Sequence, residues 1–206
     1  MSVLSDVGSA AAFVVSAYSL YQTTLKRAAI QVFVSPVIRY ASPYQNSNFE
    51  AFAVPVTLTN EGARTGLIVS MDLQVRAPER DVIKRFYSAD LGQWSIEKNR
   101  TGDFRPFAPI VLAGRTSHTE TILFHARRDE PVMQIVDKEG SYQFMLTMQT
   151  TLEEGFGFLN RLRQKPPKPL LFDMVLPALD HRAFTSGSGT LPLHHKNFQT
   201  SASAAT

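Results

Sequence analysis

The sequence contains no cysteine, a single tryptophan and few charged side chains, which make up 19% of its 206 residues. Without cysteine the chain has no disulfides, no thiolate metal sites and no cysteine nucleophile. The length allows one ordinary domain with extensions. The hydrophobic fraction of 44% is too high for a wholly disordered chain, and the formal net charge of +3 is modest.

The N-terminal segment from Val7 to Leu25 contains no charged residue. As a helix it would be about 28 Å long, close to the hydrocarbon thickness of a bilayer. Lys26 and Arg27 follow at once, whereas a secretory signal peptide has its basic residues before the apolar stretch. We therefore predict an uncleaved, single-pass membrane anchor with the folded body in the cytoplasm, on the side of the two basic residues. The predicted anchor residues are Val7, Phe13, Val14, Val15, Tyr18, Leu20, Tyr21 and Leu25.

Two alternatives remain open for this segment. Several serines make it a marginal span, and the a/d-like spacing of Val14, Tyr18, Tyr21 and Leu25 also suits a surface helix or one that packs on a partner. Gly8, Ala12 and Ser16 share one helix face, which would let two such helices approach closely. A homo-oligomer formed through the helix is therefore a further hypothesis.

Beyond Ala29 the hydrophobic period changes to two, which is typical of β-strands. Large apolar side chains on one face and polar ones on the other indicate antiparallel sheets with one wet side. We predict a mainly β fold, an antiparallel β-sandwich that is loosely immunoglobulin-like, although the immunoglobulin cysteine pair is missing and Trp94 lies in a polar stretch. The alternating runs are Ile30–Val34, Phe52–Leu58, Leu67–Val75, Glu120–Phe124, Tyr142–Met148 and Leu170–Leu176. Two further strand candidates are Val82–Tyr87, which is short and mixed, and Ile110–Leu112, which is apolar throughout.

These patterns divide the chain into three parts. Residues 1–29 form the predicted helix and residues 30–184 the predicted sandwich. Residues 185–206 are rich in serine, threonine, glycine and alanine, and this composition predicts a disordered tail.

Motifs for common chemistries are absent from the sequence. It has no P-loop, no G-x-G-x-x-G and no G-x-S-x-G nucleophile elbow. The five histidines do not converge at metal-ligand spacing, and Asp180-His181 has no nucleophilic serine placed to complete a triad. We therefore expect no cofactor, no metal site and no catalytic residues, and we interpret the chain as a non-enzyme.

A basic group near the C-terminal side is the remaining candidate surface. Arg161, Arg163, Lys165 and Lys168 gather in a stretch without acids. They would suit an anionic membrane surface, or they form a solvated loop between strands. Nucleic acid is disfavoured as a partner because the basic residues elsewhere are interspersed with acids.

The leading functional hypothesis is a membrane-tethered β-sandwich that serves as a binding or scaffolding module for another protein. Its basis is the anchor-like segment together with a body that lacks a converging catalytic set. The alternative is a soluble sandwich enzyme or carbohydrate-binding domain whose N-terminal helix packs on its own body. That alternative predicts a concave site with polar and aromatic residues and a perturbed titratable group.

Overall fold

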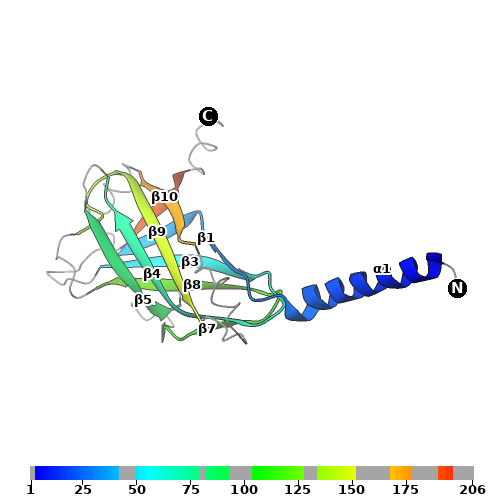
Figure 1. The fold of residues 1–206 in the computed structure, drawn as a ribbon. Coiled ribbons are helices and arrows are strands. Elements are labelled where there is room, and N and C mark those ends of the chain that lie inside the picture. The colour runs from blue at the N-terminus through cyan, green and yellow to red at the C-terminus, as the bar shows by residue number, and fades with distance from the viewer. Residues whose placement is uncertain are drawn as a thin grey trace.

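The computed structural model describes residues 3–41, 50–78, 82–92, 104–127, 134–151, 168–177 and 190–196. An N-terminal helix, α1 (Val3–Leu20), is continued by a π-helical turn, η1 (Tyr21–Leu25), and then by a β domain. The helix projects away from one end of this domain (Figure 1). The described strands are β1 (Ile30–Val34), β2 (Val37–Ala41), β3 (Ala51–Asn60), β4 (Gly66–Arg76), β5 (Ile83–Leu91), β6 (Arg105–Pro106), β7 (Ile110–Leu112), β8 (Ser117–Ala126), β9 (Gly140–Thr150), β10 (Leu170–Leu176) and β11 (Leu191–His195).

The strands close into a barrel, so the predicted β-sandwich, with its immunoglobulin-like character, is wrong. Eight antiparallel strands follow one another around the ring in the order β5-β8-β3-β2-β11-β10-β9-β4. The pairing of β4 with β5 completes the ring, with Leu73 opposite Phe86. Alternation in a sequence shows which side chains share a face but not which strands are neighbours, and the closing pairs decide between sandwich and barrel.

The barrel interior is filled by aromatic and branched side chains. Phe52 contacts Tyr40, Phe86 and Phe144 at ring-centroid distances of 5.0, 4.9 and 5.4 Å, and Phe144 stacks on Phe172 at 5.3 Å. Ring pairs at these separations add to the burial of apolar area. The interior is therefore a packed core.

Every alternating run of the sequence lies on a strand. In β4, however, the side chains expected to point toward the core do so in only part of the strand. Met71, Leu73 and Val75 are buried as predicted. Nearer its start, however, Ile68 is buried and Val69 is 42% exposed, because a bulge shifts the register with β9 between Ile68 and Ser70. An extra residue in one strand reverses the alternation, which a strict period of two does not reveal.

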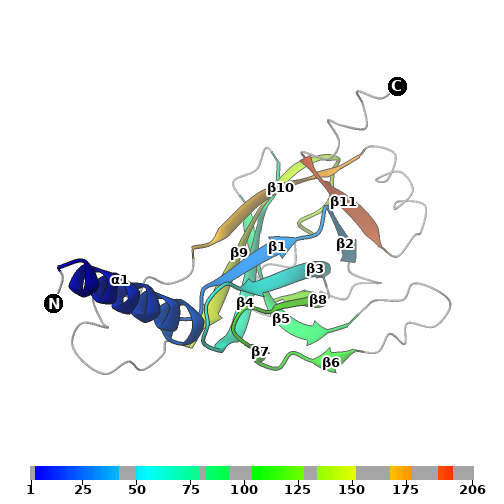
Figure 2. The same ribbon diagram turned by 90° about the vertical axis from the view of Figure 1, so that its right-hand side faces the viewer.

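The C-terminal strand β11 falls in the region that the sequence assigned to a disordered tail. It pairs with both β2 and β10 (Figure 2), and Leu191 and Leu193 are buried in the core. Leu191–His195 therefore belong to the barrel.

The predicted transmembrane anchor is wrong. None of the described helices is both long enough and apolar enough to cross a bilayer. The single-pass membrane localisation, and the cytoplasmic side inferred from Lys26 and Arg27, depended on that span and are not supported.

Candidate functional site

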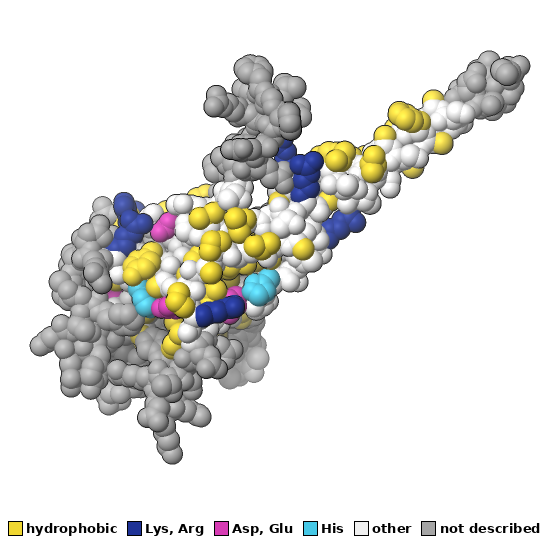
Figure 3. All heavy atoms as spheres, turned by 90° about the horizontal axis from the view of Figure 1, so that it is seen from below, with side chains coloured by type: hydrophobic (Ala, Val, Ile, Leu, Met, Phe, Trp, Pro, Cys, Tyr) yellow, Lys and Arg dark blue, Asp and Glu magenta, His cyan; other side chains and the backbone are white. Residues whose placement is uncertain are grey.

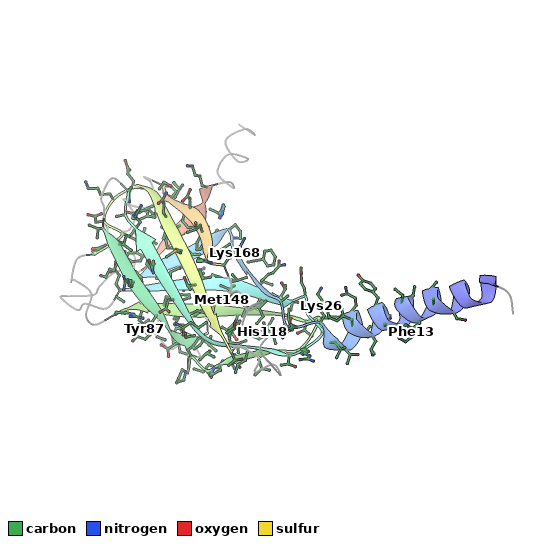
Figure 4. The ribbon with its side chains drawn as sticks, viewed as in Figure 1. Phe13, Lys26, Tyr87, His118, Met148 and Lys168 are labelled. Atoms are coloured by element: carbon green, nitrogen blue, oxygen red, sulfur yellow. The ribbon has the colours of Figure 1, made fainter. Side chains whose placement is uncertain are left out.

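The most unusual surface of the molecule is helix α1. Every side chain described in it, from Gly8 to Leu20, is exposed, and the side chains include large apolar groups. Phe13 is 74% exposed and Tyr18 64% exposed, and the labelled Phe13 stands clear of the barrel in Figure 4. Most amphipathic helices bury their apolar stripe against their own domain, and α1 does not. The exposed large hydrophobic residues of α1 and η1 are Phe13, Val14, Val15, Tyr18, Leu20, Tyr21 and Leu25.

The apolar side chains of α1 are arranged in rows. Ala11, Val14 and Tyr18 follow the 3–4 spacing of a packing face, and Phe13 and Leu20 lie on the opposite side. Gly8 has open space around it, since a Cβ there would meet nothing within 4 Å. The space-filling view shows apolar side chains along the helix, and basic side chains where it meets the body (Figure 3).

The base of the helix is fastened to the barrel by hydrogen bonds. The Lys26 carbonyl accepts from the backbone N–H groups of Ala63 and Arg64, at 2.9 and 3.1 Å, in the turn between β3 and β4. The Arg115 guanidinium, from the turn between β7 and β8, donates to the Gln22 carbonyl at 2.6 Å. Two turns of the barrel therefore hold the end of the helix.

Asn60 connects these parts. Its side-chain oxygen accepts from the N–H groups of Ala29 and Gly62, at 3.1 and 3.0 Å. Its amide nitrogen donates to the carbonyls of Arg64, Leu112 and Ala113, at 2.8, 3.2 and 3.1 Å. Because Asn60 is only 2% exposed, these bonds are shielded from water. We call Asn60, Gly62 and Arg115 the helix mount.

A second polar site lies inside the barrel and centres on Glu50. The Tyr40 hydroxyl donates to Glu50 Oε1 at 2.5 Å, the Ile135 N–H donates to the same oxygen at 2.8 Å, and Lys84 Nζ forms an ion pair with Oε2. Glu50 is fully buried and Lys84 is 4% exposed. Both carboxylate oxygens therefore have partners, as a buried charge requires.

The chemistry that this Glu50 cluster allows is limited. Burial, followed by the charge of Glu50, raises the pKa of Tyr40 above its ordinary value, so the phenol stays protonated and acts as a donor. The bond from Ile135 shows what the cluster does for the fold, because it holds the segment before β9 against the barrel. We interpret the Glu50 cluster as a structural site.

Outside the barrel, two histidines lie beside carboxylates. His118 Nε2 is 3.6 Å from Glu120, which also pairs with Arg105, and His125 Nε2 is 3.6 Å from Asp90. Burial lowers the pKa of His125, and the nearby Asp90 charge opposes that shift. Across the described residues, no three His, Cys, Asp or Glu side chains are grouped to hold a metal ion.

The residues predicted from the sequence are only partly brought together. Lys26 and Arg27 are half-buried at the base of the helix, and Lys168 is exposed just before β10 (Figure 4). Arg161, Arg163 and Lys165 lie outside the described residues, as does the side chain of Val7. The basic group therefore has no described geometry beyond Lys168.

Sequence reasoning missed the helix mount and the Glu50 cluster. It gave no functional role to Asn60 at the end of β3, to Glu50, which precedes β3, or to Lys84 in β5. A usable signal existed for Lys84, which lies on the same face of its strand as Phe86 and therefore points toward the core.

Comparisons with known proteins give no family. No protein-family model matches the chain, and none of the curated proteins matches it. Among solved structures, a crystal structure of a Bordetella pertussis protein named as ApaA is 16% identical with a TM-score of 0.34, covering 71% of this chain and 94% of that one. A β-glucosidase involved in saponin metabolism from intestinal bacteria is 12% identical with a TM-score of 0.30, covering 72% of this chain and 16% of that one. Likenesses this weak support no statement about fold or function.

Proposed function

We propose that this chain is a non-enzymatic scaffold that assembles with further copies of itself through α1 and displays its barrels to a protein partner. The observation that carries the proposal is the exposure of every described side chain of α1. Val14, for example, is 65% exposed. Contiguous exposed apolar surface of this kind marks an interaction site.

A second copy of the same helix suits this surface better than a different partner does. The helix has no charged residue between Asp6 and Lys26, so identical helices meet without charge repulsion along this stretch, and the stretch offers no charge by which a different partner would be selected. The 3–4 spacing of Ala11, Val14 and Tyr18 is the spacing of helices that pack along their length.

The barrel supports a role in display more than in catalysis. Among the described residues, the buried carboxylate with a charged partner is Glu50, and both its oxygens are engaged in bonds that hold the fold. The helix mount fixes the end of the helix to two turns of the barrel, so an assembly of helices would set the positions of the barrels.

Analytical ultracentrifugation of the full chain tests the proposal. We expect an oligomer for the unchanged chain and a monomer for the double variant V14K/Y18K, because two ammonium groups on the packing face repel their copies. The matched control is S16K/S19K, which adds the same charge on the side of the helix away from Ala11, Val14 and Tyr18. A monomeric unchanged chain, or equal dissociation of both variants, contradicts the proposed packing face.

A further inference from the structure

Strand β1 has one free edge. It pairs with β3 along its whole length, from Ile30 opposite Asn60 to Val34 opposite Val56, and no other described strand pairs with it. Its inward side chains Ile30, Val32 and Val34 are only half-buried, whereas Val54, Val56 and Leu58 of β3, which has neighbours on both sides, are at most 1% exposed. Among the described strands, therefore, β1 has no neighbour on the side away from β3.

The first half of β10 is in the same position. Residues Leu170–Asp173 pair with β9, but β11 pairs only with Met174 and Val175. The described part of β11 therefore lies between β2 and β10 at one end of the barrel, and β1 and β10 continue past it (Figure 2). We call the facing edges of Ile30–Val34 and Leu170–Asp173 the β1–β10 seam.

The register of β11 aligns the two edges. His194 is opposite both Val37 and Val175, so these two residues lie at one level of the barrel. Because β11 is antiparallel to both neighbours, β10 runs in the same direction as β2 and β1. Both edges therefore begin at the end of the seam nearest to Lys26 and Lys168, which precede β1 and β10 in the chain.

Hydrogen-bonding groups of β1 point into this seam. The Glu61 N–H donates to the Ala29 carbonyl, so the odd-numbered residues of β1 bond to β3. By the alternation of an antiparallel ladder, the N–H and C=O groups of Ile30, Val32 and Val34 face the seam. Outside it, Phe33 and Leu171 are 53% and 73% exposed and flank it with apolar surface.

We propose that the β1–β10 seam binds an extended, acidic C-terminal segment of a partner protein by strand addition. The segment lies antiparallel to both edges, as β11 does, so its C-terminal end reaches the end marked by Lys26 and Lys168. Carboxylates there complement the two ammonium groups, and apolar residues at alternate positions complete the contacts of Val32 and Leu170. The site is separate from α1, so it stands or falls independently of the assembly proposed above.

The test uses a labelled eight-residue peptide of alternating valine and threonine that ends in two aspartates with a free carboxylate. Fluorescence anisotropy measures its binding to the full chain, and amide hydrogen exchange followed by NMR locates it. We expect slower exchange at Ile30, Val32 and Val34, and no change at Gln31 and Phe33, which already bond to β3. Protection elsewhere, or none, overturns the proposal.

Four variants sharpen the result. Val32→Pro removes an N–H that faces the seam and leaves the bonds to β3, so we expect binding to fall at least about tenfold. K26E/K168E should weaken binding about fivefold at low salt, whereas R105E, a charge reversal beside Glu120 and outside the seam, should not. V14K/Y18K should bind the peptide as the unchanged chain does, which separates this site from the helix.

A shortened chain ending at Lys196 tests whether residues 197–206 of the chain itself compete with the peptide for the seam. Equal affinity of the full and shortened chains supports a partner segment as the occupant. Binding that occurs only after residues 197–206 are removed overturns the proposal in favour of a segment of the chain itself.

Discussion

The side chain of Asn60, the last residue of β3, accepts a hydrogen bond from the backbone N–H of Ala29 at 3.1 Å. This bond ties β3 to the chain that enters the barrel from α1. The same side chain donates to the Ala113 carbonyl in the turn between β7 and β8. One buried amide therefore joins the helix connection to two turns. If α1 is the assembly element, Asn60 determines how rigidly each barrel follows its helix.

Replacing Asn60 tests this relationship. Asn60→Ala leaves the Ala29 and Gly62 N–H groups and several carbonyls without their buried partner, so we expect the free energy of unfolding to fall by about 3 kcal/mol. Asn60→Asp keeps the acceptor oxygen but turns a buried carboxylate toward the three carbonyls to which Asn60 donates, so at neutral pH it should cost more than Asn60→Ala. Urea denaturation measures both. A smaller loss for Asn60→Asp than for Asn60→Ala would contradict the donor role assigned to the amide.

The close approach of Gly62 to the helix base gives a second prediction. A Cβ at Gly62 would overlap the Arg27 carbonyl oxygen, which is backbone and cannot swing aside as a side chain can. We expect Gly62→Ala to destabilise the barrel and to speed proteolytic cleavage near residues 26–29, as limited proteolysis would show. The matched control is Gly8→Ala, where nothing lies within 4 Å. There alanine should stabilise the helix by about 0.8–1 kcal/mol.

The sequence predicted the strands well and their closure poorly. Alternation located Phe52–Leu58 and Tyr142–Met148 because each strand has one wet face and one core face. It failed at Val69, where a bulge reverses the alternation, and at β11, where a polar, flexible composition concealed the short pattern of Leu191 and Leu193. Barrel closure depends on pairs between strands far apart in the chain, which local periodicity does not encode.

The candidate sites could be predicted from the sequence only in part, for a related reason. Seven of the eight residues predicted as a membrane anchor, all except Val7, form an exposed apolar helix surface, so the pattern was informative although the inference of a span was wrong. Asn60 and Glu50 gave no such pattern, because a single polar residue acquires its role only from partners that the fold brings to it. Ile135, 85 residues from Glu50, is one such partner.

The buried ion pair of Glu50 and Lys84 gives a third prediction. Glu50→Gln or Lys84→Met breaks this ion pair and leaves the other charge buried without its opposite charge, so each single change should cost about 3–5 kcal/mol. The double variant E50Q/K84M removes both charges and should recover much of that loss, because the desolvation cost of the pair disappears as well. A double-mutant cycle by urea denaturation measures the coupling. Additive losses would mean that the two charges act independently.

Tyr40 gives a fourth prediction at the same site. Its hydroxyl donates to Glu50 and its ring packs on Phe52, so Tyr40→Phe keeps the ring and deletes one bond to a charged acceptor. We expect a loss of about 1.5–3 kcal/mol in the free energy of unfolding. The absorbance of the phenolate on alkaline titration supplies a second readout, because burial raises the pKa of Tyr40 and so predicts that it ionises at a pH above the ordinary range of tyrosine.

His125 makes the stability of the protein depend on pH in a predictable direction. Burial lowers its pKa in the folded state below the ordinary value of 6.5, and Asp90 offsets only part of that shift. The unfolded chain therefore binds a proton at a higher pH than the folded chain does. The contribution of His125 to stability is fully present above pH 6.5, and it is lost as the pH drops from there toward the lower pKa of the folded state.

Thermal denaturation of the unchanged chain and of His125→Gln between neutral and mildly acidic pH isolates this contribution as the difference between two curves. We expect the curves to run parallel above neutral pH, and the unchanged chain to lose more stability than the variant on acidification. An equal loss in both would assign the acid sensitivity to other groups.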